Sequence, residues 1–103
     1  MSAKFNGREW QNEELLKKYR ENSAKILDCQ LALENYEDFN NVVVEKFSNI
    51  SKNWVEIKKK INTDAQLYEE SCNILQNYLA LLEEIGRENF TFYKDGSIEY
   101  NAK

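Results

Sequence analysis

The sequence predicts an all-α protein of 103 residues, an antiparallel helical bundle or long helical hairpin with a C-terminal β-hairpin. Proline is absent, and no glycine occurs between Gly7 and Gly86, so that stretch lacks both residues that break helices. Apolar residues recur there at steps of three and four, which is the spacing of one helix face. After Gly86, the dipeptide Asp95-Gly96 separates two short alternating runs, a pattern typical of a hairpin turn.

About three helices are expected, over residues 9–36, 41–61 and 63–85. Residues 35–41 are rich in asparagine, which favours a turn with Asp38 or Asn41 as the next cap, although a single helix over 9–61 stays possible. Thr63 and Gln66 have the form of a capping box at the start of the third helix. The expected apolar stripes are, in the first helix, Leu16, Tyr19, Ile26, Cys29, Leu33 and Tyr36; in the second, Val43, Phe47, Ile50, Trp54, Ile57 and Ile61; in the third, Ala65, Tyr68, Cys72, Leu75, Leu79 and Leu82.

The C-terminal segment changes period. Gly86 directly follows Ile85 and is placed to end the last helix in a left-handed conformation. A β-hairpin is expected over residues 90–100, and a two-residue loop at Asp95-Gly96 would place Tyr93 opposite Ile98. An isolated hairpin is marginal in water, so this one needs its own bundle, a second copy or a partner to lie on. The chain is then one helical domain, 1–103, with an N-terminal extension at 1–8 and a hairpin appendage at 88–103.

The composition disfavours catalysis. Histidine is absent, which removes the usual general base, the commonest zinc ligand and every Ser-His or Cys-His pair. The two cysteines are 43 positions apart, no calcium-loop spacing is present, and no glycine-rich loop could hold a phosphate. We therefore expect no enzyme, no catalytic residues, no metal, no cofactor and no small-molecule substrate.

Charge and hydropathy limit the partners and the compartment. Residues 58–60 form the only basic run, and the net charge is −4, so direct nucleic-acid contact is disfavoured. Uninterrupted apolar runs such as residues 42–44 are far shorter than the ~20 residues of a membrane span. The first ten residues are polar and lack a signal-peptide core. These features predict a cytoplasmic or otherwise intracellular protein in a reduced compartment.

The remaining class is a non-enzymatic helical interaction module, a subunit or adaptor of a homo- or hetero-oligomeric coiled-coil assembly. Val42, Val44 and Val55 lie off the main stripe of the second helix and widen its apolar face. Such a face predicts either a central position or an intermolecular contact. The candidate partner-binding residues are Trp10, Val44, Val55, Phe92, Tyr93 and Tyr100, because aromatic residues are favoured at binding hot spots. The alternative is a small phage- or host-encoded inhibitor that occludes an enzyme or a nucleic-acid-binding site.

Residues 46–61, KFSNISKNWVEIKKKI, resemble the helical core of the KxDL family, small subunits of lysosome-positioning and organelle-biogenesis complexes. The signature of that family would fall on residues 58–61, where Lys60 stands in place of the expected aspartate. The same stretch is similar to the third helix of a spectrin-type repeat. Each match covers under a third of the chain, and no residue is assigned from either family.

Overall fold

The computed structural model describes residues 3–5, 8–36, 41–60 and 63–101. Three helices carry the fold: α1 (Glu13–Glu34), α2 (Asn41–Lys60) and α3 (Asp64–Ile85). Two short strands precede them, β1 (Ala3–Phe5) and β2 (Arg8–Trp10). A 3-10 turn (Arg87–Asn89) and the strands β3 (Phe90–Phe92) and β4 (Ile98–Tyr100) follow. The expected helical bundle with a C-terminal hairpin is confirmed, and α1 and α2 are separate helices.

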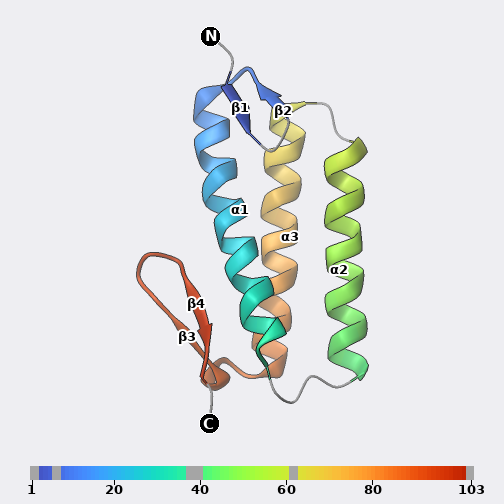
Figure 1. Ribbon diagram of the computed structural model, residues 1–103, viewed down its shortest axis with the longest axis vertical. Helices are drawn as coiled ribbons and strands as arrows, with labels where there is room; N and C mark the ends of the chain where they lie inside the picture. The colour runs from blue at the N-terminus through green and yellow to red at the C-terminus, as the bar shows by residue number, and fades with distance from the viewer. Residues whose placement is uncertain (1–2, 6–7, 37–40, 61–62, 102–103) are drawn as a thin grey trace.

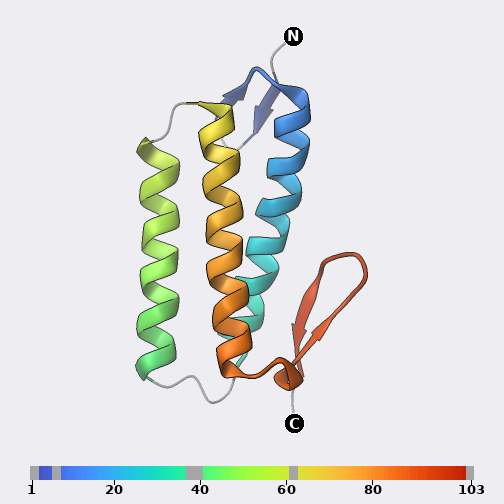
Figure 2. The same ribbon diagram turned by 180° about the vertical axis from the view of Figure 1, so that it is seen from behind.

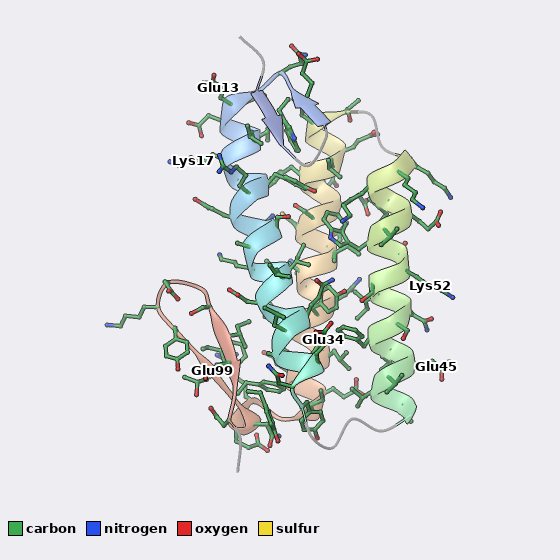
Figure 3. All side chains as sticks on the ribbon, viewed as in Figure 1. Glu13, Lys17, Glu34, Glu45, Lys52 and Glu99 are labelled. Atoms are coloured by element: carbon green, nitrogen blue, oxygen red, sulfur yellow. The ribbon has the colours of Figure 1, made fainter. Side chains whose placement is uncertain are left out.

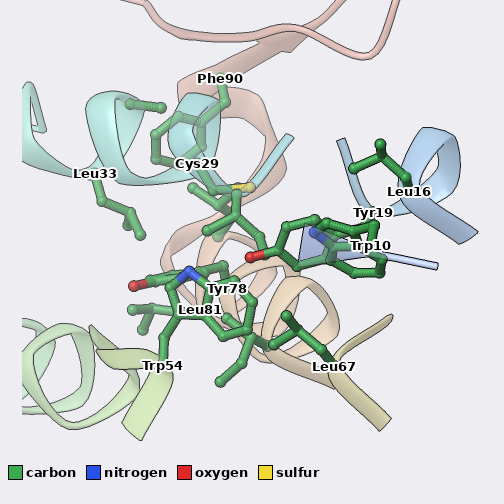
Figure 4. Packing of buried hydrophobic residues seen from close by; sticks show 14 residues of the cluster. Trp10, Leu16, Tyr19, Cys29, Leu33, Trp54, Leu67, Tyr78, Leu81 and Phe90 are labelled. Atoms are coloured by element: carbon green, nitrogen blue, oxygen red, sulfur yellow. The ribbon is translucent and has the colours of Figure 1, made fainter. Parts of the chain in front are cut away.

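The third helix is the centre of the bundle. Figures 1 and 2 show α3 between α1 and α2, with consecutive helices running in opposite directions. The buried core consists mainly of α1 and α3 side chains, and Trp10 packs onto it beside Tyr19 (Figure 4). Of the α2 side chains that the structure describes, Trp54 alone is buried. The second helix is therefore a flank of the bundle and not its centre.

Local sequence signals fix the helix ends. Asn12 caps α1, and its side-chain oxygen accepts a hydrogen bond of 3.2 Å from the N–H of Leu15. Thr63 caps α3 by accepting from the N–H of Gln66, as predicted. Gly86 ends α3 with a φ of +123°, a backbone conformation that other residues rarely adopt. The proposed cap Asp38 and the stripe residue Ile61 lie outside the described residues.

The N-terminus differs from the expectation. The first helix begins at Glu13 and not at residue 9, because β1 and β2 pair as an antiparallel hairpin in which Ala3 lies opposite Trp10. Trp10 is fully buried, and its ring lies 4.8 Å from that of Tyr19, centroid to centroid. Part of the expected extension at 1–8 therefore belongs to a strand pair that places Trp10 over the core.

The apolar stripe of α3 is displaced from the predicted one. Tyr68, Cys72, Leu75 and Leu79 are only half-buried. The reason is that α3 packs against α1 on one side and against α2 on the other. Its most deeply buried residues lie between these two contact faces and include the polar Ser71. The fully buried residues of this helix are Leu67, Ser71, Ile74, Tyr78, Leu81 and Leu82.

The C-terminal hairpin has a different register from the one expected. Phe92 pairs with Ile98, and Phe90 pairs with Tyr100. The loop has three residues, 94–96, because the N–H of Tyr93 donates to the carbonyl of Ser97 and Gly96 takes a φ of +94°. This one-residue shift brings the apolar side chains onto one face. That face packs on α1 of the same chain and on Tyr36 just beyond its end, whose ring lies 5.6 Å from the Tyr100 ring, centroid to centroid.

Candidate partner-binding groove

A groove of about 490 Å³ lies between α1 and α2. We call it the α1–α2 groove. It exists because α3 holds the two outer helices on either side of itself and leaves them without close contact over much of their length (Figure 1). Its lining consists of Arg20, Ser23, Ala24, Ile26, Leu27 and Gln30 from α1, and of Trp54 and Lys58 from α2.

Tyr78 of α3 holds the two outer helices at a fixed spacing. Its side chain is fully buried, and its hydroxyl accepts a hydrogen bond of 3.0 Å from the side-chain amide of Gln30 on α1. The same hydroxyl lies 2.7 Å from the hydroxyl of Ser51 on α2. A second link between α1 and α3 joins the side-chain amide of Asn22 to Ser71, at 3.0 Å. Buried hydrogen bonds of this kind have directional geometry, so they define the separation of the helices.

Four exposed apolar side chains follow the two outer helices, and we call them the edge residues; of these, Leu27 lines the groove. On α1, Leu27 is 54% exposed and Leu31, one turn later on the same face, is 48% exposed. On α2, Val44 and Val55 are 38% and 45% exposed, and both lie near the face of Ser51, which points to Tyr78. These four residues are most of the large exposed hydrophobic side chains in the part of the chain that the structure describes.

The upper end of the groove is positively charged. Arg20 and Lys58 are the charged side chains of the lining, and both are cations. The Lys58 ammonium lies 5.1 Å from the centre of the Trp54 ring, within the range of a cation–π interaction. In a chain of net charge −4, this end has the opposite sign to the average surface.

A second hollow, of about 530 Å³, lies beside the C-terminal end of α3. Its lining includes Val43 of α2 and Leu81 of α3, and Lys46 and Glu84 form an ion pair in it. Because this pair ties α2 to α3 across the hollow, we do not regard it as the partner site.

The predicted partner residues fall into three places. Val44 and Val55 are exposed on α2, outside the residues that line the α1–α2 groove. Trp10 is 0% exposed inside the core of its own chain, so in this conformation it is not accessible to a partner. The hairpin residues Phe92, Tyr93 and Tyr100 lie on the other side of α1 from α2 (Figure 1).

Within the hairpin, two of these three residues are engaged in contacts of their own chain. The Arg87 guanidinium lies 4.2 Å from the Phe92 ring, and Tyr100 packs on Tyr36. Tyr93 is 48% exposed and donates a hydrogen bond of 2.9 Å to Glu99, which raises the pKa of the phenol. The prediction also missed Leu27 and Leu31, which lie outside the α1 stripe and are apolar without being buried.

The described residues include cysteine and acidic side chains, which are types that bind metal ions or act as nucleophiles. No cluster of three or more cysteine or acidic side chains there could hold a metal ion. Cys29 and Cys72 are free thiols, and burial, aided by the nearby Asp28 carboxylate, raises the pKa of Cys29 to about 12. A thiol with that pKa is protonated at neutral pH and is not a nucleophile.

The fold and the site define a class, an open bundle of three helices with exposed apolar side chains on its two outer helices. No family model matches the sequence, and no solved structure matches it. The cell division protein FtsB of Francisella tularensis subsp. tularensis (strain SCHU S4 / Schu 4) is 33% identical over 69 residues, which are 63% of this chain and 71% of that protein. The chain belongs to the FtsB family of cell division proteins.

This relationship corrects the expected location. FtsB is a membrane-anchored division protein that faces the periplasm, so the prediction of a cytoplasmic or intracellular protein is wrong. In the described part of the chain, none of the three helices has the length and apolar character of a membrane span.

Proposed function

We propose that this chain is a non-enzymatic adaptor in a cell-division complex and that the α1–α2 groove holds its protein partner. The observation that carries the proposal is the position of α2. Its wide apolar face required either a central place in the bundle or a contact with another chain. The centre is taken by α3 (Figure 1), and Val44 and Val55 of α2 stay exposed.

The energetics favour occupation of the groove. Full burial of a valine or leucine side chain contributes about 1.5–3 kcal/mol relative to full exposure. Because the four edge residues are about half exposed, covering all of them contributes roughly half of that amount for each. A partner that covers this surface therefore gains enough to offset part of the cost of association.

The shape of the groove favours a helical partner. Its two walls are helices, and its apolar residues follow helical spacing on both of them. An amphipathic helix that lies in such a groove places its apolar face against both walls at once. The cell-division role rests on the family relationship to FtsB. The alternative of an inhibitor that occludes an enzyme or nucleic-acid site stays a prediction.

A photo-crosslinking side chain at position 31 tests the proposal in the native cell. We expect a discrete protein adduct from position 31 and none from Lys52, which points away from the bundle on the outer side of α2 (Figure 3). Replacement of the chromosomal copy by Leu31→Asp should impair division as much as deletion does, whereas Lys52→Asp should not. Absence of an adduct at position 31 together with normal division in Leu31→Asp cells would refute the proposed function.

A further inference from the structure

We infer that α2 detaches as a unit from the rest of the bundle, which stays folded, and that this opening controls the α1–α2 groove. The part that stays folded consists of α1, α3 and the two hairpins, and we call it the α1–α3 unit. The inference is carried by the uneven distribution of buried side chains and of contacts among the three helices.

The α1–α3 unit holds nearly all of the described core. Six side chains of α1 and six of α3 are buried. Of the α2 side chains that the structure describes, Trp54 is buried, whereas Phe47, Ile50 and Ile57 on the same face are only half-buried. Loss of α2 therefore exposes a small part of the core, and regions with few buried apolar contacts open at a lower free energy than the whole domain.

The α1–α3 unit has contacts of its own along its whole length. At the upper end, the Asp64 carboxylate of α3 accepts a hydrogen bond of 3.1 Å from the N–H of Asn12, which caps α1. In the middle, the Asn22 amide donates to the hydroxyl of Ser71. At the lower end, β4 packs on α1. None of these contacts involves α2, so they remain when α2 leaves.

The contacts of α2 with this unit centre on three side chains. The ring of Phe47 lies 6.0 Å from that of Tyr78, and the ring of Trp54 lies 6.2 Å from that of Tyr19, centroid to centroid. Ser51 adds the hydroxyl contact with Tyr78 at 2.7 Å. Loss of these contacts is the main cost of opening.

The ion pair of α2 with α3 and the helix propensity of α2 add little to the closed state. The side chains of Lys46 and Glu84 are about half exposed, and ion pairs in contact with water contribute little to stability. An isolated helix of this length is marginal in water, and the three valines at 42–44 have a lowered helix propensity. Once detached, α2 should therefore lose its backbone hydrogen bonds, which makes its amides exchange with solvent.

Opening of α2 is linked to partner binding. The groove is complete only in the closed state, because its lining comes from α1 and from Trp54 and Lys58 of α2. A protein that contacts both walls binds the closed state and not the open one, so it should reduce the opening of α2. This consequence rests on the proposed function, whereas the opening itself is a property of the isolated chain.

Native-state hydrogen exchange of the full chain, followed by NMR for each amide, tests the inference. After correction for intrinsic rates, the amides of residues 50–56 in α2 should share one opening equilibrium. They should exchange about tenfold faster, or more, than the amides of Ile26 in α1 and Ile74 in α3. Equal protection of the three helices in the wild type would overturn the inference, and this comparison needs no variant.

Two variants distinguish opening of α2 from unfolding of the whole chain. Phe47→Ala removes packing that only the closed state has, so it should accelerate the exchange of α2 about tenfold. Asn22→Ala removes a contact that the open state keeps, so it should accelerate exchange in the α1–α3 unit about fivefold and leave that of α2 unchanged. Equal acceleration of α2 and the α1–α3 unit by Asn22→Ala would show that the chain unfolds only as a whole.

The proposed function and the opening of α2 can fail separately. Exchange is measured on the chain alone, whereas the proposed function depends on a protein adduct from position 31 in cells. Independent opening of α2 without such an adduct would support the inference and contradict the proposed function. Equal protection of all three helices together with an adduct would support the proposed function and overturn the inference.

Discussion

The phenolic hydroxyl of Tyr78 lies 2.7 Å from the hydroxyl of Ser51 and thereby joins the central helix to the outer helix α2. The same oxygen accepts a hydrogen bond from Gln30 on α1. One fully buried hydroxyl therefore contacts both walls of the groove. Removal of this hydroxyl should make the separation of the helices less well defined and should also lower the stability of the bundle.

Tyr78→Phe should lower the free energy of unfolding by about 1–2 kcal/mol, because the amide of Gln30 and the hydroxyl of Ser51 lose their buried partner. Urea denaturation measures the change. The matched control is Tyr93→Phe, where an exposed hydroxyl is removed and a change below about 0.5 kcal/mol is expected. Equal effects in the two variants would show that Tyr78 does not hold the helices together.

Much of the fold could be predicted, because helix breakers and apolar periodicity act locally. The break at Thr63 and the end at Gly86 were both found from short signals. The N-terminal hairpin lies where an extension and the start of a helix at residue 9 are expected, although Asn6-Gly7 is a dipeptide typical of hairpin turns. The register of the C-terminal hairpin depends on whether its loop has two or three residues, and Asp95-Gly96 is compatible with both.

Trp10→Ala tests whether Trp10 belongs to the core or to a partner surface. Because the ring is fully buried against Tyr19, its loss should lower the free energy of unfolding by about 3–5 kcal/mol. Chemical denaturation of the isolated chain is the measurement. The exposed Tyr93 provides the comparison, since Tyr93→Ala should cost less than about 1 kcal/mol. A stable Trp10→Ala variant would return this residue to the partner-binding set.

Asp64 connects the N-terminal segment to α3. Its carboxylate accepts hydrogen bonds from the N–H groups of Gln11 and Asn12, at 2.8 and 3.1 Å. Asp64→Ala should lower the free energy of unfolding by about 1–2 kcal/mol, because two N–H groups at the start of α1 lose their acceptor. Glu69→Ala, an exposed acid on the same helix, is the control. Faster amide exchange at Gln11 and Asn12 in Asp64→Ala alone would locate the effect.

The partner-binding residues stay a prediction, and part of the exposed apolar surface follows from the sequence. Val44 and Val55 are candidates because they stand outside a stripe that accounts for most other apolar residues of α2. Leu27 and Leu31 stand outside the α1 stripe in the same way, and the same argument would have found them. What periodicity could not supply is which helix is central, because that depends on the packing of all three helices and not on the pattern of any one.

The two thiols should differ strongly in reactivity. Burial raises the pKa of Cys29 to about 12, so this residue is protonated and shielded from reagents at neutral pH. Cys72 is half-buried, with the Asn22 amide 3.2 Å from its sulfur. Alkylation at pH 8 should give one faster phase, which Cys72→Ser removes, and one phase limited by unfolding, which Cys29→Ala removes. Rapid alkylation of Cys29 in the folded protein would contradict its burial.

The hairpin loop should lose stability in acid. The side-chain and backbone groups of Ser97 donate hydrogen bonds to the Asp95 carboxylate and lower its pKa below the ordinary value of 3.8. A carboxyl whose pKa is lower in the folded state stabilises that state above pH 3.8, and the contribution disappears as the pH falls through the lowered pKa. Amide exchange of Tyr93, whose N–H donates to Ser97 across the loop, should therefore accelerate below that pH. Asp95→Asn keeps an acceptor oxygen but cannot titrate, so its exchange should lack the acid-dependent acceleration, and an unchanged pH profile in this variant would exclude Asp95 as the responsible group.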